Sequence, residues 1–261
     1  MDHTNTVPGD LATGARAAHS PSKASNLGER YGEIAQKSPA IPDYLHKHYW
    51  WAYVHPNAVR VFERQWLANL ILWGNYPRLR DSALSAMGLS LTGRTIQIAC
   101  AYGDVTTILS KRVRDASGHL DVIDVLPTQL NNLQRKLPAD MPVALHLMDS
   151  AALTIPDASY DRALIFFLLH EQPESWRKRT LAEAFRVVKP GGRIVIVDYA
   201  CPNSWNPLKR LFGPILKALE PFALDLWHEE VSYWMPEPWA SQPFARRAYF
   251  GGLYQEIVIQ T

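Results

Sequence analysis

The stretch from Thr95 to Asp104 constrains the fold of this chain more than any other. It is an apolar run that stops abruptly in the small residues Ala99, Ala101 and Gly103, and a helix-like pattern comes after it. Small residues after a buried strand let the backbone approach a cofactor closely, and glycine also tolerates a positive φ. Alone, the stretch is typical of an ordinary strand and turn. The residues after Asp104 favour a modified loop for a nucleotide-type cofactor.

Strand-like and helix-like patterns alternate after this loop. We expect strands at 95–100, 120–125, 143–148, 160–168 and 193–199, helices at 105–114, 127–136 and 173–188, and a turn at 189–192. A final antiparallel hairpin is expected at 246–250 and 253–260. The alternation predicts a doubly wound, mostly parallel α/β sheet that binds ligands at the carboxyl ends of its strands.

Acidic residues follow two of the expected strands. Asp124 ends the second strand about twenty residues after the small-residue loop, where a carboxylate can accept both ribose hydroxyls of an adenosine cofactor. Asp149 and Ser150 follow the third strand, where an acid can accept a hydrogen bond from an adenine amino group. Asp161 precedes the fourth strand, and we interpret it as structural.

The fourth strand runs into a histidine and a glutamate. His170 and Glu171 follow Phe166 and its apolar neighbours, on the edge of the sheet that is expected to hold the ligand. An imidazole there could transfer protons or bind a metal. A single histidine at a strand end is equally often a structural group, so both interpretations stay open for His170.

The first 92 residues differ in character from the rest. Residues 1–40 are rich in Ala, Ser, Pro and Gly and predict a mobile tail. Residues 41–92 begin with dense aromatics, including Tyr53, which either pack a core or line a pocket for a flat ligand. After Pro56 an apolar stripe from Val59 to Trp73 predicts a helix. We favour packing of this helix on the main domain, and a partner or membrane face is the minority interpretation.

A second helix is expected at 206–219, with Asn206 as N-cap and Pro207 at the first helical position. It has a broad apolar side and the bases Lys209, Arg210 and Lys217, and Pro214 should kink it. This composition suits a membrane surface or a lid over the pocket, and both can hold at once.

Composition limits the remaining classes. The 261 residues suffice for one large α/β domain, over 93–261, with an appendage. A net charge of +2, with acids and bases mixed, gives no argument for a nucleic-acid partner. The two cysteines indicate neither a disulfide framework nor a zinc site and fit a reducing, intracellular setting. No apolar stretch approaches the ~20 residues that span a bilayer. The oligomeric state stays open.

The order of elements from Gly93 to Gln260 resembles the class I methyltransferases that use S-adenosylmethionine (SAM), which have a Rossmann-like sheet of seven strands. The phrases Asp124–Pro127, Asp149–Ala151, Val187–Arg193 and Gly251–Gln255 are similar to their counterparts in quinone C-methyltransferases. The resemblance implies a SAM site. Its expected residues are Gln97, Ala99, Cys100, Ala101, Tyr102, Gly103, Asp124, Val125, Asp149, Ser150 and Phe166.

A narrower resemblance rests on Tyr49–Pro56, Arg64–Trp66, Leu72–Asn75 and Ala99–Asp104. These segments are similar to the RquA family of rhodoquinone biosynthesis. That resemblance implies conversion of ubiquinone to rhodoquinone, in which an amino group replaces a ring methoxy group, SAM donates the amine and manganese is required. It also implies an enzyme of anaerobic respiration, cytoplasmic and held peripherally on the inner face of the membrane.

Catalytic candidates under this resemblance are Gln97, His170 and Tyr53. In ordinary methyltransferases an acid stands at the place of Gln97 and keeps the SAM ammonium charged, because a neighbouring negative charge raises the pKa of an amine. A neutral Gln97 removes that bias and would let the amine attack a quinone carbon. A divalent cation could stabilise the charge on the quinone oxygen. Asp104, His170 and Glu171 are possible manganese ligands by chemistry, but no spacing selects them.

Two rival interpretations remain. A conventional quinone or small-molecule C-methyltransferase suits the fold but not the altered loop. A non-catalytic subunit with the SAM fold, binding quinone or a membrane complex, suits the altered loop and the amphipathic helix. Asp124 and Asp149 argue against that subunit, since a site without cofactor has no need of acids facing it.

Overall fold

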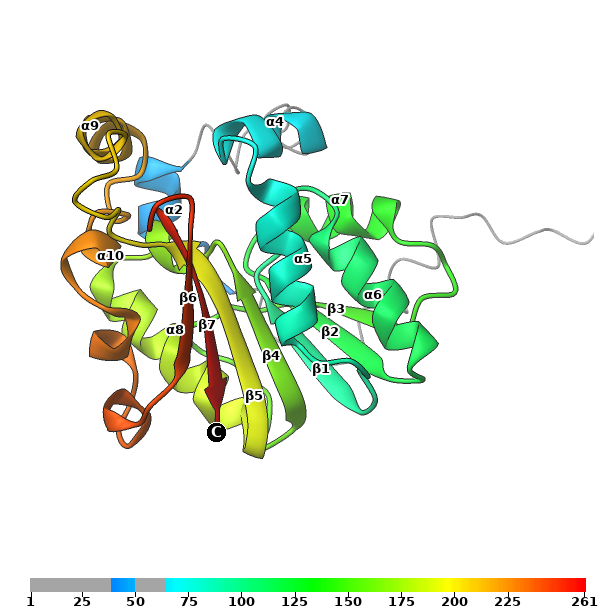
Figure 1. Ribbon diagram of the computed structural model, residues 1–261. Helices are drawn as coiled ribbons and strands as arrows, with labels where there is room; N and C mark the ends of the chain where they lie inside the picture. The colour runs from blue at the N-terminus through cyan, green and yellow to red at the C-terminus, as the bar shows by residue number, and fades with distance from the viewer. Residues whose placement is uncertain (1–38, 50–63) are drawn as a thin grey trace, which may run out of the picture. The chain divides into compact units, whose positions relative to one another are not determined.

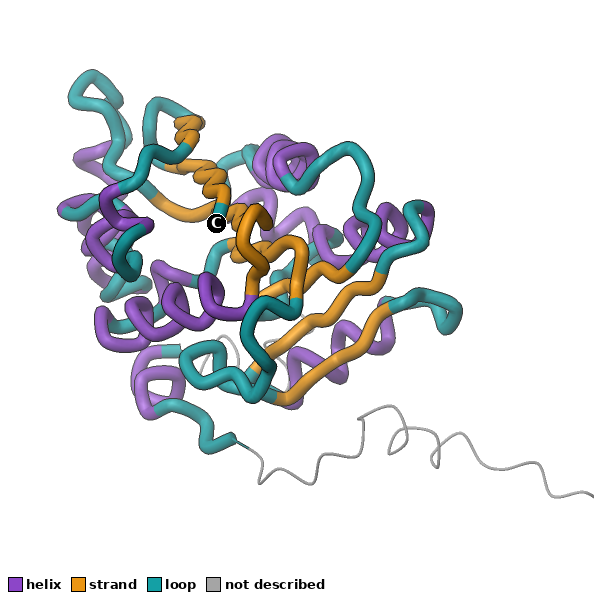
Figure 2. Tube along the Cα trace, turned by 90° about the horizontal axis from the view of Figure 1, so that it is seen from below, coloured by secondary structure: helices purple, strands orange, loops and turns teal. Residues whose placement is uncertain are grey.

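The computed structural model describes residues 39–49 and 64–261, which form a sheet with helices on both of its faces (Figures 1 and 2). Its seven strands lie in the order β3-β2-β1-β4-β5-β7-β6. The strands are β1 (Arg94–Ile98), β2 (His119–Asp124), β3 (Val143–Leu147), β4 (Tyr160–Phe166), β5 (Val188–Tyr199), β6 (Ala245–Tyr249) and β7 (Tyr254–Gln260). The first five pair in parallel, and β7 and β6 complete the sheet antiparallel. The predicted doubly wound α/β fold is confirmed.

Helices connect and cover these strands. They are α2 (Asp43–His48), α4 (Gln65–Ile71), α5 (Tyr76–Ala86), α6 (Val105–Asp115), α7 (Pro127–Lys136), α8 (Glu174–Val187), α9 (Lys209–Leu219) and α10 (Asp225–His228), with 3₁₀ turns η2 (Leu169–Glu171), η3 (Val231–Trp234) and η4 (Trp239–Ser241). The helix predicted at 127–136 has the observed bounds of α7. No described helix has the length and apolar character needed to cross a bilayer.

The position of β1 in the sheet explains its composition. It lies between β2 and β4, so Thr95–Ile98 is buried on both faces, as an apolar central strand must be. Its register places Ile98 beside Ile123 of β2 and Ile165 of β4. The carboxyl ends of these three strands therefore meet at one edge of the sheet, and the loops after them lie together there.

The predicted turn at 189–192 is wrong, because these residues belong to β5. The pairing with β4 shifts register there, from Val188 opposite Tyr160 to Arg193 opposite Arg162. Gly191, at φ +77°, supplies the backbone freedom for this irregularity, and its N–H donates to the Thr261 carbonyl at 2.6 Å. Gly191 and Gly192 therefore mark a bulge within β5.

The helix predicted at 206–219 begins later, at Lys209. Asn206 lies before it and joins the helix start to the β6–β7 hairpin: Oδ1 accepts the Leu208 N–H at 3.0 Å and Nδ2 donates to the Phe250 carbonyl at 3.1 Å. Pro207 therefore precedes the helix instead of opening it. Pro214 lies inside α9, as expected.

The apolar stripe of the first predicted helix faces outward where it is described. Val59 and Phe62 lie outside the described residues, while Trp66 and Leu70 of α4 are 61% and 63% exposed. Contact with the rest of the protein comes next to α4, where Leu72 is buried and the Trp73 ring lies 5.2 Å from the ring of Phe212 on α9. The favoured interpretation, a stripe packed on the main domain, is wrong for Trp66 and Leu70.

Candidate functional site

A cavity of about 630 Å³ lies at the carboxyl edge of the parallel strands. Loops after β1, β2, β3 and β4 form one part of its wall, and α2, α4 and α9 form the other. The predicted residues that line it are Ala99, Cys100, Ala101, Tyr102, Asp124, Val125, Asp149, Ser150, Phe166 and His170. Gln97 and Gly103 do not line it, and Tyr53 lies outside the described residues.

The loop after β1 has the shape that glycine prefers. Ala99 is at φ +70°, a left-handed conformation that costs a residue with a Cβ roughly 1–2 kcal/mol. The loop is held by two hydrogen bonds: the Ala99 N–H donates to the Ile123 carbonyl at 3.0 Å, and the Cys100 N–H donates to Asp124 Oδ2 at 2.8 Å. With alanine at position 99 the backbone still adopts the conformation that glycine prefers, at a cost in backbone strain.

Gln97 lies beneath this loop. Its side chain is fully buried, and its Nε2 donates to the Ala99 carbonyl at 3.0 Å. It supports the strained residue and makes no part of the cavity wall. The proposed direct action of Gln97 on the SAM amine has no geometric support here, and Gln97 is better described as a positioning residue.

Gly103 has a packing role. Its φ is +88°, and a Cβ there would lie 2.3 Å from the Tyr76 hydroxyl. That hydroxyl accepts the N–H groups of Asp104 at 2.8 Å and Val105 at 3.1 Å, so it satisfies donors at the start of α6. The glycine is needed because Tyr76 occupies the space beside it.

Asp124 and Asp149 lie at the cavity wall, as their strand-end positions predict. Asp124 accepts the Cys100 N–H through Oδ2 and the Leu126 N–H through Oδ1, each at 2.8 Å. Burial raises the pKa of Asp124 to about 6, against the opposing effect of these hydrogen bonds. Asp149 Oδ1 accepts the Ala151 N–H at 2.9 Å. Both acids thus shape the loop in which they lie.

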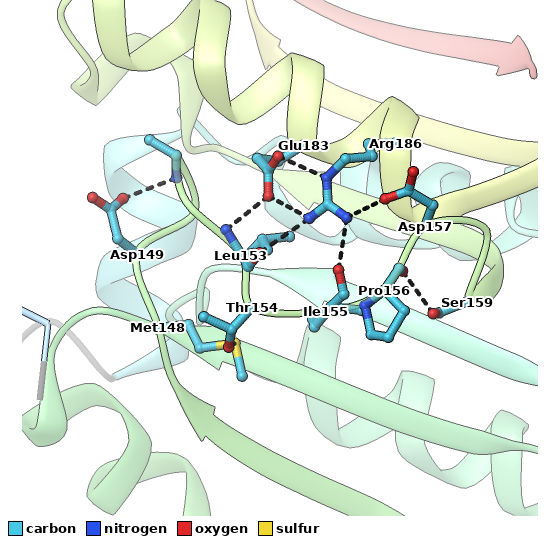
Figure 3. Close-up of polar contacts among 11 residues, drawn as sticks. Met148, Asp149, Leu153, Thr154, Ile155, Pro156, Asp157, Ser159, Glu183 and Arg186 are labelled. Carbon is cyan, nitrogen blue, oxygen red and sulfur yellow. Dashed lines mark hydrogen bonds and ion pairs between the residues drawn. The ribbon is translucent and has the colours of Figure 1, made fainter. Parts of the chain in front are cut away.

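The segment after Asp149 is anchored by Arg186 and Glu183 of α8 (Figure 3). Arg186 donates to the carbonyls of Ile155 at 2.7 Å and Leu153 at 3.0 Å, and Glu183 Oε2 accepts the Leu153 N–H at 2.7 Å. These charge-assisted hydrogen bonds fix the loop on the helix. The backbone that presents Asp149 to the cavity is held in place by them.

His170, Glu171, Asp198 and Glu220 form a polar group, here called the His170 cluster; His170, Glu171 and Glu220 line the cavity, and Asp198 lies behind His170. His170 is 6% exposed, and its Nδ1 lies 2.9 Å from Asp198 Oδ1. Asp198 is fully buried and also accepts the N–H groups of Leu169 and Tyr199, each at 2.8 Å. A histidine oriented by a buried carboxylate is a common arrangement for proton transfer.

Charge in the cluster favours the protonated imidazole. Burial alone lowers the pKa of His170, but the negative charges of Asp198, Glu220 and Glu171 outweigh it and raise the pKa to about 9. Glu220, the C-cap of α9, brings a carboxyl to the cavity wall, and burial raises its pKa although His170 opposes this. Its buried Oε2 accepts no hydrogen bond from the described residues.

Arg177 of α8 connects the segments that carry this cluster. It is fully buried and donates to the carbonyls of Leu169 and Gln172, on either side of His170, each at 2.9 Å. It also donates to the Phe222 carbonyl at 3.0 Å, two residues after Glu220. The guanidinium lies over the Trp234 ring, 4.3 Å from its centroid. One side chain therefore fixes η2 against the end of the α9 segment.

The sequence did not single out Asp198, Glu220 or Arg177, all of which are at or beside this site. Tyr44, one of the dense aromatics that begin the segment 41–92, lines the cavity. Asp198 had a usable signal, because it is an acid near the end of a buried strand, as Asp124 is. Glu220 had none, because only the folding of α9 over the sheet edge brings it near His170.

The possible manganese ligands Asp104, His170 and Glu171 are not grouped as a metal site. Asp104 accepts two hydrogen bonds from Arg80 Nη1, at 2.9 and 2.8 Å, and His170 Nε2 lies 3.9 Å from Glu171 Oε1. Within 39–49 and 64–261, no three His, Cys, Asp or Glu side chains are grouped to hold a metal ion. The described residues therefore do not fit the ion.

The known proteins that are similar to this chain are methyltransferases, which agrees with the fold described above. Residues 96–192 match the family model described as "Methyltransferase domain". The chain is 24% identical over 193 residues to the demethylmenaquinone methyltransferase of Bacillus subtilis, covering 72% of this chain and 80% of that protein. It is 27% identical over 146 residues to the ubiquinone/menaquinone biosynthesis C-methyltransferase UbiE of Laribacter hongkongensis, covering 55% and 58%.

Among solved structures, an O-methyltransferase family protein from Burkholderia thailandensis is 16% identical, with a TM-score of 0.59, over 90% of this chain and 68% of that one. The fold is thus the class I fold of SAM-dependent methyltransferases. The domain that it contains is related, at low identity, to quinone methyltransferases.

Proposed function

We propose that this protein is a SAM-dependent C-methyltransferase of a quinol ring. The observation that carries the proposal is one cavity with two chemically different ends. The cofactor end consists of Ala99–Tyr102, Asp124 and Asp149, and the substrate end consists of the His170 cluster with the apolar residues of α4 and α9. The quinone-methylating relatives support the substrate class.

The cofactor end suits SAM in its charge. Asp124 would bind the ribose hydroxyls, Asp149 the adenine amino group, and the backbone at Ala99–Ala101 the amino-acid part. Among the described residues of the cavity wall, four are acids (Asp124, Asp149, Glu171 and Glu220) and none is lysine or arginine. This charge favours a sulfonium cation and disfavours a substrate with phosphate or carboxylate groups.

The substrate end suits a flat ring with an apolar tail. Ile71, Trp73, Phe212, Ile215 and Leu219 supply apolar walls, and His170 is the polar group among them. SAM supplies the methyl group. His170 in its neutral form accepts the proton of a ring hydroxyl, and the resulting negative charge increases the nucleophilicity of the ring carbon. After the methyl group is added, that carbon loses its own proton and the aromatic ring is restored. Because the pKa of His170 is about 9, turnover should rise as pH increases towards 9.

A second candidate is the conversion of ubiquinone to rhodoquinone with SAM as amino donor. The protonated state of His170 favours it, because an imidazolium that donates to a quinone oxygen makes the ring more susceptible to an amine. The departures at Gln97, Ala99 and Ala101 also suit a reaction other than methyl transfer. In this case turnover should fall as pH rises through the pKa of His170, because the donor is lost.

One experiment separates the candidates. Purified protein is incubated with SAM, with and without manganese, and either ubiquinone or a quinol lacking its ring methyl group, and the products are identified by mass spectrometry. Gain of a methyl group by the quinol supports the first proposal, and replacement of methoxy by amino supports the second. No change in either substrate, with SAM bound in calorimetry, would indicate a non-catalytic quinone-binding subunit and contradict both.

The arrangement of segments also suggests their roles. We propose that residues 41–92 act as a cap over the SAM domain at 93–261, since α2 and α4 contribute Leu45 and Leu67 to the cavity wall. The tail at 1–40 is assigned no role in catalysis. A peripheral position on the cytoplasmic face of a membrane would suit a quinone substrate, which is dissolved in the bilayer.

A further inference from the structure

The rim of the cavity gathers exposed apolar side chains from two distant segments. Among the described residues, ten large apolar side chains are exposed, and seven of them belong to α4, the turn after it, or α9. These seven, here called the apolar rim, are Trp66, Leu70, Ile71, Trp73, Leu211, Ile215 and Leu219. Solvent-exposed apolar residues gathered in one place mark an interaction surface.

The rim is continuous with the cavity. Ile71, Trp73, Ile215 and Leu219 are exposed and also line the cavity wall. The contact of Trp73 with Phe212 joins the two helices across the mouth. Both helices lie beyond the carboxyl ends of the strands, on the same edge of the sheet (Figure 1). A ligand that leaves the cavity between them therefore passes directly over apolar side chains.

Within the two helices of the rim, the charged side chains are all basic. The sequences of α4 and α9 contain no aspartate or glutamate. Exposed bases flank the rim: Arg64 before α4, and Arg210 and Lys217 on α9. The nearest acid at the end of α9, Glu220, is at the cavity wall. An exposed apolar strip on helices that carry bases and no acids is the pattern of a surface that binds anionic lipid headgroups and inserts its apolar residues at the interface.

We infer that the apolar rim docks on an anionic bilayer, so that a lipid-soluble substrate enters the cavity from the membrane without crossing water. This inference rests on the proposed quinone substrate for its purpose, but the docking itself is independent of the reaction. A second copy of the chain is the alternative occupant of the rim, and the test distinguishes it.

The test uses residues of the rim that do not line the cavity. Trp66→Ser with Leu70→Ser changes α4, and Leu211→Ser changes α9; none of these side chains belongs to the cavity wall. The matched control is Leu89→Ser, because Leu89 is fully exposed but lies between α5 and β1, outside the rim. Sedimentation with vesicles of phosphatidylcholine, with and without phosphatidylglycerol, measures binding.

The parent and Leu89→Ser should sediment with the anionic vesicles, and each rim variant should bind roughly tenfold more weakly, as expected for loss of about 1.4 kcal/mol. Turnover of a short-tailed, water-soluble quinol without vesicles should stay unchanged in the rim variants. If the parent binds neither type of vesicle, or if the rim variants bind as tightly as the parent, the inference is wrong.

A dimer detected by light scattering that dissociates in the rim variants would assign the rim to a second copy and also overturn the inference. Failure of the proposed function would show itself differently, as vesicle binding by the parent with no turnover of any quinol. The two failures are therefore distinguishable within one set of proteins.

Discussion

At the proposed cofactor end of the cavity, Asp124 ends β2, Asp149 follows β3, and both accept backbone N–H groups of loops at the sheet edge. At the proposed substrate end, His170, Asp198 and Glu220 come from η2, β5 and the C-cap of α9, and the charges of Asp198 and Glu220 act on His170. The acids of the first end are stabilised by local backbone, and the groups of the second end by long-range contacts. We therefore expect mutations at the first end to change binding and mutations at the second to change proton transfer.

The largest effect is expected for Asp198→Asn. Loss of this charge should lower the pKa of His170, since Asp198 is the main group that raises it, and should reduce turnover by roughly 10²-fold. The dependence of kcat on pH should move to lower pH, while the Kd for SAM stays within about twofold. Asp140→Asn, at a mostly exposed acid that does not line the cavity, is the control. An unchanged pH profile would show that Asp198 has only a structural role.

The charge on His170 should also affect stability. Its pKa in the folded state, about 9, lies above the unfolded value of 6.5, so its contribution is complete below pH 6.5 and is lost as pH rises through 9. The free energy of unfolding should therefore fall by up to about 3 kcal/mol over this range. Denaturant titrations at pH 6.5 and 9 measure the change, and His170→Gln should remove most of it. If the free energy of unfolding changes equally between pH 6.5 and 9 in the parent and in His170→Gln, the assignment is refuted.

A smaller effect is expected at the cofactor end. Asp149→Ala and Asp124→Ala should each weaken SAM binding by roughly 1.5–3 kcal/mol, because each removes a charged hydrogen-bond partner. Asp124→Ala should also lower stability, since its carboxylate holds Cys100 and Leu126. Calorimetric titration with SAM gives the affinities and thermal unfolding gives the stability. Unchanged affinity in both variants would contradict the cofactor assignment.

The smallest effect is expected at Ala99. Because its φ is +70°, Ala99→Gly should relieve strain and raise the free energy of unfolding by about 1 kcal/mol or less. Ala101→Gly is the matched control, since Ala101 is not at positive φ and should lose stability from added chain entropy. Equal changes in the two variants would mean that the strain at Ala99 is not significant.

The sequence predicts which strand-end residues line the cavity at the proposed cofactor end, but not the groups around His170 at the proposed substrate end, for a physical reason. A parallel sheet brings all strand ends to one edge, so spacing along the chain suffices to place Asp124 and Asp149. Glu220 and Arg177 depend on how α9 and α8 pack, which no local pattern encodes. For Gln97 the motif predicts contact with the cofactor, and this stays a prediction; its place within a buried strand directs its Nε2 to the Ala99 carbonyl.

Arg177 joins two parts of the chain, η2 and the segment after α9, through three backbone carbonyls. Because it holds Leu169, Gln172 and Phe222 by their backbone carbonyls, the side chains at those positions can vary without loss of the anchor. The segment between β5 and Phe222 is attached at its far end by Arg177, near its start by Asn206 and within α9 by the buried Phe212, so its exposed positions are the ones that can differ. Evolution could therefore reshape the lid for a ring or tail of another size while the imidazole stays in its place.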